Sequence, residues 1–240
     1  EDGIRDYKVT GVQTCALPIW RSMGGDLRGV VRDGTAPKRK PSFVMASPSL
    51  GEVIRDINKF SNNVMAQQLF LTLGRWPSPP RGKSLNTQAA QGADTDMPNW
   101  PSATFERSRE RIREWWGARI GTASVPEIDN GSGLSRRSQL QAQALGDMLQ
   151  KVHQSPYLAE LMASLPIAGV DGTLRRYPDG RVKAHLKTGS LRGVVSLAGY
   201  VHTSQGENVV LVAVVNHERA QAARPALEAL VQWVAEQPSK

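Results

Sequence analysis

The fold class is decided by residues 182–216, VKAHLKTGSLRGVVSLAGYVHTSQGENVVLVAVVN. Three β-rich runs predict strands over 182–186, 194–202 and 208–216, and Ser204–Glu207 predicts a hairpin between the last two. Val209–Val215 is apolar at every position, which predicts a central strand that is covered on both faces.

Helical patterns surround these strands. Upstream, helices are predicted over 50–60, over 64–74 with Gly74 as the stop, over 104–116, over 138–152, and from Ser155-Pro156 to about 166. Downstream, residues 221–235 predict a final helix that packs on the sheet through Leu227, Leu230, Val231 and Val234. Helices followed by a run of strands indicate an α+β fold, an antiparallel sheet flanked by helices.

Composition excludes several classes of protein. With 40% apolar and 22% charged residues, the 240-residue chain is neither disordered throughout nor a coiled coil. The longest apolar run has seven residues, too few for a transmembrane segment. The net charge of +8 comes from dispersed basic residues without interleaved aromatic ones, so we expect no nucleic acid as a partner. The four histidines lack metal-ligand spacing.

Two short motifs carry candidate chemistry. Ser61-Asn62-Asn63 lies between two predicted helices, and Lys187-Thr188-Gly189 lies at the end of a predicted strand. They match two of the three motifs of penicillin-recognising serine acyl-transfer enzymes, Ser-x-Asn and Lys-Thr-Gly, the third being Ser-x-x-Lys. A second Ser-x-Asn, Ser84-Leu85-Asn86, is set aside because residues 75–103 are rich in Pro, Ser and Gly and predict an inserted surface loop.

The Lys-Thr-Gly motif suits the recognition of a peptide carboxylate. The ammonium of Lys187 supplies a positive charge for that group and polarises the hydroxyl of Ser61. Thr188 offers a second hydrogen bond to the carboxylate. Gly189 has no side chain, so a peptide can lie against the strand edge.

The remaining candidates would serve the reaction itself. Ser61 could relay a proton to the leaving amine, while the amide of Asn63 orients the substrate and the catalytic lysine. The backbone N–H of Ser190 is a candidate oxyanion donor. Taken alone, the motifs are also compatible with a surface lysine at a strand end and an ordinary turn between helices.

Longer stretches resemble the D-alanyl-D-alanine carboxypeptidase/endopeptidase family, low-molecular-mass penicillin-binding proteins that trim peptidoglycan. The stretches are GEVIRDINKFSNNVMAQQLFLTLG (51–74), DNGSGLSR (129–136), SPYLAELMASLPIAGVDGTLRR (155–176), AHLKTGSLRGVVSLAGYV (184–201) and VVLVAVVNH (209–217). The Asp129–Ser135 loop, although it matches a family signature, is expected mainly as a turn that shapes the cleft wall.

This resemblance implies part of the penicillin-binding/β-lactamase-like transpeptidase fold and a periplasmic or cell-envelope location. It implies peptidoglycan stem peptides as substrates, β-lactams as acylating inhibitors of the full-length protein, and neither a metal nor an organic cofactor. The family's Ser-x-Asn falls on Ser61 and Asn63, and its Lys-Thr-Gly falls on Lys187, Thr188 and Gly189.

The chain departs from the family at the nucleophile. None of its serines is followed by a lysine three residues later, so the Ser-x-x-Lys motif is missing. Residues 1–19, EDGIRDYKVTGVQTCALPI, resemble a translated sequencing adapter. We therefore expect 1–19 to be non-native and 20–240 to be the carboxyl-terminal part of the domain. As given, the chain should be inactive in acyl transfer. The alternative is a non-catalytic relative that binds peptidoglycan or peptides.

Overall fold

The computed structural model describes residues 17–26, 46–75, 102–178 and 180–237. The chain divides into two units, Glu1–Ser47 and Pro48–Lys240. In the first unit the described element is helix α2 (Leu17–Ser22), which spans the expected boundary between residues 19 and 20. Residues 1–16, most of the predicted 75–103 insertion and the second Ser-x-Asn copy, Ser84–Asn86, lie outside the described residues.

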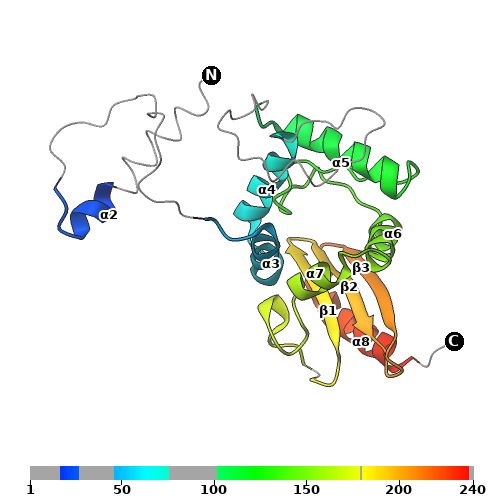
Figure 1. Cartoon of the computed structure of the whole chain (residues 1–240). Helices are drawn as coiled ribbons and strands as arrows, with labels where there is room; N and C mark the ends of the chain where they lie inside the picture. Colours follow the sequence, from blue (N-terminus) through cyan, green and yellow to red (C-terminus); the bar gives the residue numbers. More distant parts are fainter. Residues whose placement is uncertain (1–16, 27–45, 76–101, 179, 238–240) are drawn as a thin grey trace. The chain divides into compact units, whose positions relative to one another are not determined.

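The second unit is built on an antiparallel sheet in the order β1-β2-β3 (Figure 1). Strands β2 (Val194–His202) and β3 (Asn208–Asn216) and their hairpin have the predicted bounds. Strand β1 (Ala184–Leu191) differs, because it begins two residues later than predicted and continues through the Lys-Thr-Gly motif. In its register Lys187 pairs with Ala198 and Gly189 with Ser196, so the motif lies within a strand rather than at its end.

The predicted central position of Val209–Val215 is not found in the described part of the sheet. Among the described strands, β3 lies at an edge and β2 is central. Cover on both faces holds for part of the run, since Val210 and Val212 pack towards α6 and α7 and Leu211 packs towards α8, whereas Val214 is 45% exposed. A continuous apolar run reports burial of the two faces of a strand, and it carries no information on how many hydrogen-bonded neighbours the strand has.

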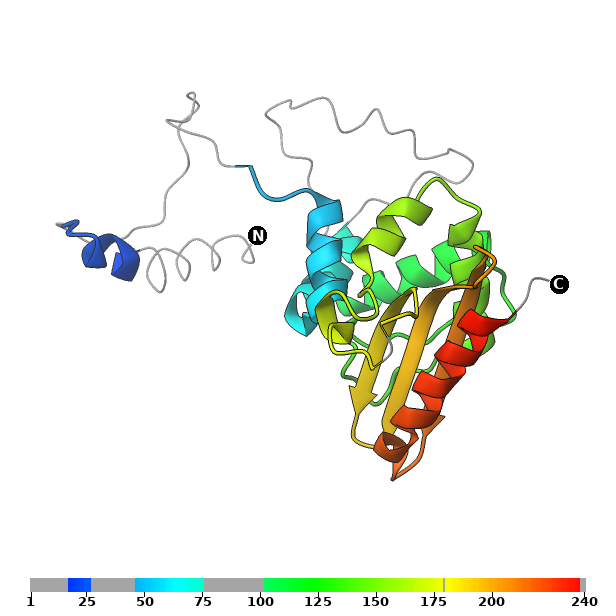
Figure 2. The ribbon, with the colours of Figure 1, turned by 90° about the horizontal axis from the view of Figure 1, so that it is seen from below.

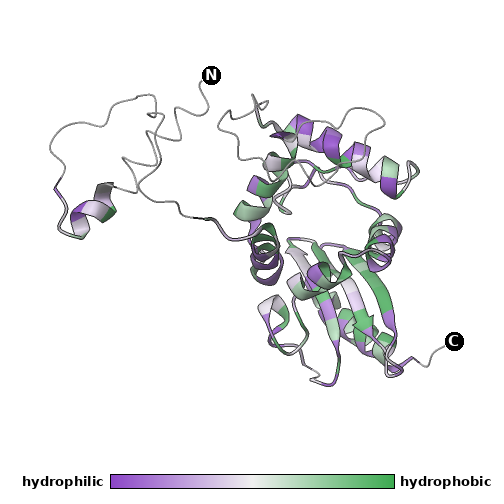
Figure 3. Ribbon diagram, in the orientation of Figure 1, coloured by the Kyte–Doolittle hydropathy of each residue, from purple (hydrophilic) through white to green (hydrophobic). Residues whose placement is uncertain are grey.

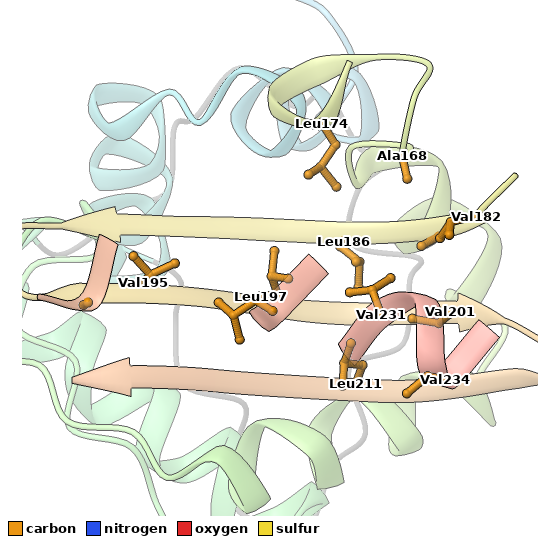
Figure 4. Close-up of a cluster of buried hydrophobic side chains, with 13 residues drawn as sticks. Ala168, Leu174, Val182, Leu186, Val195, Leu197, Val201, Leu211, Val231 and Val234 are labelled. Atoms are coloured by element: carbon orange, nitrogen blue, oxygen red, sulfur yellow. The ribbon is translucent and has the colours of Figure 1, made fainter. Parts of the chain in front are cut away.

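Helices cover both faces of the sheet. On one face lies the predicted last helix, as the 3-10 turn η4 (Ala220–Ala223) followed by α8 (Arg224–Glu236), which begins three residues later than predicted (Figure 2). Of its predicted packing residues, Leu227, Val231 and Val234 are buried and Leu230 is partly buried, and Figure 4 shows Val231 and Val234 in the cluster. On the other face lie α6 (Ala142–His153) and α7 (Leu158–Ser164), which pack around the buried ring of Tyr200. Figure 3 shows that β3 is largely hydrophobic. The predicted α+β class is confirmed.

Helix α3 (Leu50–Phe60) has the predicted bounds and begins with a capping box formed by Ser49 and Glu52. The apolar side chains of α3 are only partly buried, because Leu50 and Phe60 are 61% and 71% exposed, whereas Lys59 is buried. Helix α3 packs beside α7 and the 3-10 turn η3 (Gly172–Leu174). The end of α3 is therefore fixed by a buried charge, which the apolar pattern did not indicate.

Helix α4 (Asn63–Arg75) does not stop at Gly74 as predicted. It packs against α5 (Phe105–Arg119), which has Thr104 as its N-cap, begins one residue later than predicted and ends three residues later. A Cβ at Gly74 would lie 2.7 Å from the hydroxyl of Ser108 and 2.8 Å from the carbonyl of Thr104. Gly74 thus permits two helices to approach closely instead of ending one of them.

Helix α6 begins at Ala142, four residues later than predicted. The reason is a short antiparallel bridge in which the backbones of Glu127 and Gln139 exchange hydrogen bonds of 2.8 and 2.9 Å. These bonds hold the segment before α6 extended. Within the described residues, no helix is long and apolar enough to cross a membrane.

We expect acid to destabilise the end of β2. Burial lowers the pKa of His202, and the nearby His185, whose ring centroid lies 5.3 Å away, and Lys183 lower it further, while a hydrogen bond to the Asn208 side chain raises it. The folded state thus binds fewer protons than the unfolded state, so its stability is complete above the unfolded pKa of about 6.5 and falls as the pH drops below it. The melting temperature should fall between pH 7 and pH 5, and less so in His202→Gln. An equal fall in both proteins would contradict this assignment.

Candidate active site

Ser61 lies at the turn between α3 and α4. Its backbone has φ 53° and ψ 48°, and among the described residues it is the only one other than glycine with a positive φ. Such a backbone costs about 1–3 kcal/mol and persists where surrounding contacts impose it. Here the Ser61 amide donates to the carbonyl of Ile57 and closes α3, while the Asn62 side chain accepts from the amide of Met65 and opens α4. The hydroxyl of Ser61 is therefore presented on a constrained turn.

The structure brings Ser61 and Lys187 into direct contact. Lys187 Nζ donates to Ser61 Oγ at 3.0 Å, although the two residues are 126 positions apart, and to the carbonyl of Thr188 at 3.0 Å. Burial lowers the pKa of the Lys187 ammonium. Asn63 begins α4 and is half-buried, and in the described part of the chain its side chain makes no hydrogen bond to either residue.

The side chains of Thr188 and Ser190 lie on the opposite face of β1 from Lys187. Their cross-strand partners, Leu197 and Val195, belong to the cluster packed against α8. The Thr188 hydroxyl is 2.9 Å from that of Thr173. Ser190 Oγ accepts from Gln221 and Arg224 on the helical side. A hydrogen bond from Thr188 to a substrate carboxylate would thus compete with Thr173.

The outer edge of β1 offers backbone groups to a ligand. The amide of Leu186 points away from β2, because it donates to the carbonyl of Pro166 at 2.9 Å. Ladder bonds alternate along an antiparallel strand, so the amides of Thr188 and Ser190 point to the same outer side. Gly189 lies between them, and a Cβ there would be 2.3 Å from Ser196 Oγ. This edge has the backbone geometry that binds an added strand.

A pocket of about 320 Å³ lies between this part of β1 and α8. Its lining includes the hydroxyl residues Thr173, Thr188 and Ser190 and the guanidinium groups of Arg176 and Arg224. Ser61 and Lys187 are not among the lining residues. The pocket therefore lies on the α8 face of β1, whereas Lys187 contacts Ser61 on the opposite face.

The Asp129–Ser135 loop is a turn, as predicted. The hydroxyl of Ser135 donates to the Asp129 carboxylate at 2.6 Å, and Arg137 pairs with the same carboxylate at 2.7 Å. The hydrogen bond from Ser135, with further contributions from Arg137 and Arg109, lowers the pKa of Asp129 although partial burial opposes it. The loop is thus fixed by its own contacts.

Within the described ranges, no group of three or more His, Cys, Asp or Glu side chains lies close enough to hold a metal ion. The two histidines in ring contact, His185 and His202, lie on β1 and β2, where His185 Nδ1 is 2.9 Å from the carbonyl of Met162. His185 thus contacts a backbone carbonyl and the His202 ring, and His202 also hydrogen-bonds to the Asn208 side chain.

Sequence reasoning missed three residues beside the site: Lys59, Asp171 and Thr173. Lys59 Nζ forms an ion pair with Asp171, and Thr173 contacts Thr188 on the motif strand. Lys59 is on the polar side of α3, opposite the apolar stripe, and Asp171-Gly172 has the composition of a turn. A lysine on the polar side of a helix and a turn-like Asp-Gly pair are both usual on a solvated surface, so neither predicts a buried contact.

Comparison with solved structures defines the class of the protein. Penicillin binding protein 4 (dacB) from Haemophilus influenzae, complexed with a β-lactam, superimposes with a TM-score of 0.59 over 90% of this chain and 49% of that one, at 23% identity. The predatory endopeptidase Bd3459 from Bdellovibrio bacteriovorus superimposes with a TM-score of 0.51 over 77% of this chain and 43% of that one, at 18% identity. The fold is that of the penicillin-binding proteins, as predicted.

Residues 18–237 match the D-Ala-D-Ala carboxypeptidase 3 (S13) family, and the chain belongs to this family. It is 28% identical over 177 residues to the D-alanyl-D-alanine carboxypeptidase DacB of Haemophilus influenzae, covering 71% of this chain and 32% of that protein. It is 31% identical over 169 residues to the D-alanyl-D-alanine carboxypeptidase of an Actinomadura species, covering 67% and 27%. The chain thus spans about a third of the length of these relatives.

Proposed function

We propose that this chain supplies the Lys-Thr-Gly and Ser-x-Asn side of a serine-type D-Ala-D-Ala carboxypeptidase/endopeptidase site. Its ligand would be the carboxyl-terminal end of a peptidoglycan stem peptide. The observation that carries the proposal is the 3.0 Å contact between Lys187 Nζ and Ser61 Oγ. Membership in the S13 family supports the same substrate class.

The peptide would bind as an added strand along the outer edge of β1. The outward amide of Ser190 would donate to its scissile carbonyl, the position of an oxyanion donor. The absence of a side chain at Gly189 leaves room for the peptide to approach. The ammonium of Lys187 would attract the terminal carboxylate, in a half-buried place where a charge-assisted hydrogen bond is strong.

Ser61 and Asn63 would act on the reacting end. Because Lys187 donates to Ser61 Oγ, the hydroxyl hydrogen of Ser61 remains available to be donated to a leaving amine. Proton relay to that amine is general-acid catalysis. The side-chain amide of Asn63 would orient the peptide. Thr188 would contribute through its carbonyl, which accepts from Lys187 and holds the ammonium in place.

The 240 residues contain no Ser-x-x-Lys, so no nucleophile of the family's kind is available to form an acyl-enzyme. We propose that this chain holds such peptides without cleaving them. The same observation favours a second candidate, a non-catalytic relative that binds peptides. The gene sequence upstream of the codon for Trp20 separates the two, since an intact Ser-x-x-Lys there favours the enzyme. For the whole protein we propose a cell-envelope location and inhibition by β-lactams.

Titration with acetyl-D-Ala-D-Ala, followed by NMR, tests the proposal. We expect saturable shifts of the amide signals of Thr188, Gly189 and Ser190. The matched control is the same peptide with a carboxyl-terminal amide, which lacks the negative charge that Lys187 would recognise. Equal binding of acid and amide, or shifts confined to other strands, would overturn the proposal.

A further inference from the structure

Lys59 has the geometry of a fully bonded buried cation. It is 5% exposed. Its ammonium donates to the carbonyl of Leu165 at 2.6 Å, to Asp171 Oδ1 at 2.9 Å, and lies 2.6 Å from Asp171 Oδ2. Asp171 Oδ1 also accepts from the amide of Ile167 at 2.8 Å. Two hydrogen bonds and the ion pair of Lys59 therefore join the end of α3 to the segment over 165–171.

Two further features support the attachment of α3 to the segment over 165–171: the lowered pKa of Asp171 and the close backbone approach at Gly172. Burial would raise the pKa of Asp171, but the hydrogen bond from Lys59, with the Ile167 amide and the charge of Lys59, lowers it overall. Next to it, Gly172 has φ +57°, and a Cβ there would lie 2.6 Å from the carbonyl oxygen of Lys59. The two backbones thus approach more closely than any residue other than glycine permits.

The same short segment reaches the other half of the site. Two residues after Asp171, the hydroxyl of Thr173 is 2.9 Å from that of Thr188 on β1. Two residues after Lys59, Ser61 Oγ accepts from Lys187 on β1. Residues 171–173 therefore contact both halves of the site. Asp171 binds Lys59, next to the turn that carries Ser61, and Thr173 contacts Thr188, next to Lys187 on β1.

A buried ion pair is weak support for stability as such, because apolar residues of similar volume often serve equally well. It fixes relative position more narrowly, since the charge-assisted hydrogen bonds from Lys59 to Asp171 and to the Leu165 carbonyl are directional. We propose that Lys59 and Asp171 are positioning residues, whose ion pair holds the Ser61 hydroxyl against the ammonium of Lys187. This inference rests on the proposed function only in treating that contact as the site.

The experiment follows the titration of Lys187 in the full 240-residue chain by NMR of 13C-labelled lysine, with Lys187→Met to assign the signal. In the unaltered protein Lys187 should titrate below the usual lysine pKa of about 10.4, because burial desolvates its ammonium. In Lys59→Met we expect Ser61 to withdraw and water to reach Lys187. The pKa of Lys187 should then rise towards the usual lysine value. Lys59→Met is preferred to a substitution of Asp171. The carboxylate left without a partner is partly exposed to water, whereas an unpaired Lys59 ammonium would be buried.

Two further variants keep the test decisive if Lys59→Met folds poorly. Gly172→Ala changes no charge but forces the 171–174 turn away from α3, and it should move Lys187 in the same direction. Lys59→Met/Asp171→Asn should move it no further than Lys59→Met alone, because the two residues act through one contact. Val231→Ala, in the cluster against α8, is the matched control that lowers the melting temperature without moving Lys187.

The inference is overturned if Lys187 keeps its original titration in Lys59→Met and in Gly172→Ala while their melting temperatures fall as in Val231→Ala. That outcome would make the pair merely structural. The measurement uses no peptide, so failure of the unaltered protein to bind acetyl-D-Ala-D-Ala would reject the proposed function and leave this result standing.

Discussion

A fluorescent penicillin should leave no covalent label on this chain. Acylation needs an activated nucleophile, and none of the serines in the 240 residues has a lysine three positions later. Ser61 has a lysine as hydrogen-bond partner, but Lys187 is half-buried and donates to it, so it supports the hydroxyl as an acceptor and does not remove its proton. Gel electrophoresis under denaturing conditions, followed by fluorescence imaging, measures the label.

The positive control is the Haemophilus influenzae relative, which has been solved in complex with a β-lactam. It should carry a band that an excess of unlabelled penicillin removes. A competable band at 26.2 kDa from the present chain would show that one of its own serines is a nucleophile. The proposal of binding without cleavage would then be wrong.

Replacing Lys187 by methionine should weaken the binding of acetyl-D-Ala-D-Ala by about 10- to 100-fold. A hydrogen bond to a charged group contributes about 1.5–3 kcal/mol, and each 1.4 kcal/mol is a factor of ten in affinity. Methionine keeps most of the side-chain volume, so the loss reports the ammonium. It should also abolish the preference for the acid over the peptide amide. Isothermal titration or NMR titration measures both quantities.

Lys183→Met is the matched control. Lys183 is exposed, precedes β1, and carries the same charge, so its removal changes the net charge equally but leaves the Ser61 contact intact. We expect near-unaltered affinity at physiological ionic strength, where exposed charges are screened over about 8 Å. If both variants lost affinity equally, the attraction would be a property of the overall charge.

The local elements were predictable because their signals are local. Residues 194–202 and 208–216 form strands with the predicted bounds, and residues 50–60 form the predicted helix, since apolar periodicity and the cap at Ser49 act within a few residues. The errors have non-local causes. Gly74 is explained by the approach of α5, and the late start of α6 by a bridge to Glu127.

For the candidate site, too, the residues were predictable from the sequence but the orientation of some side chains was not. Ser61, Asn63 and Lys187 were found as motifs, because their residue types and order are written in the chain. The orientation of Thr188 and Ser190 was not, because the extension of β1 through the motif is a result of its pairing with β2. Once the strand continues, alternation directs these two side chains to the α8 face.

By itself the sequence determined the class of fold, the family resemblance and the identity of the two motif residues that meet. Only the tertiary structure decided that a lysine outside the apolar stripe of α3 is buried against Asp171, and that the same segment touches the Lys-Thr-Gly strand through Thr173. The physical reason is that a charge becomes a structural contact only when distant parts of the chain exclude water from it together. The residue pattern of a single helix or turn therefore does not predict the burial of such an ion pair.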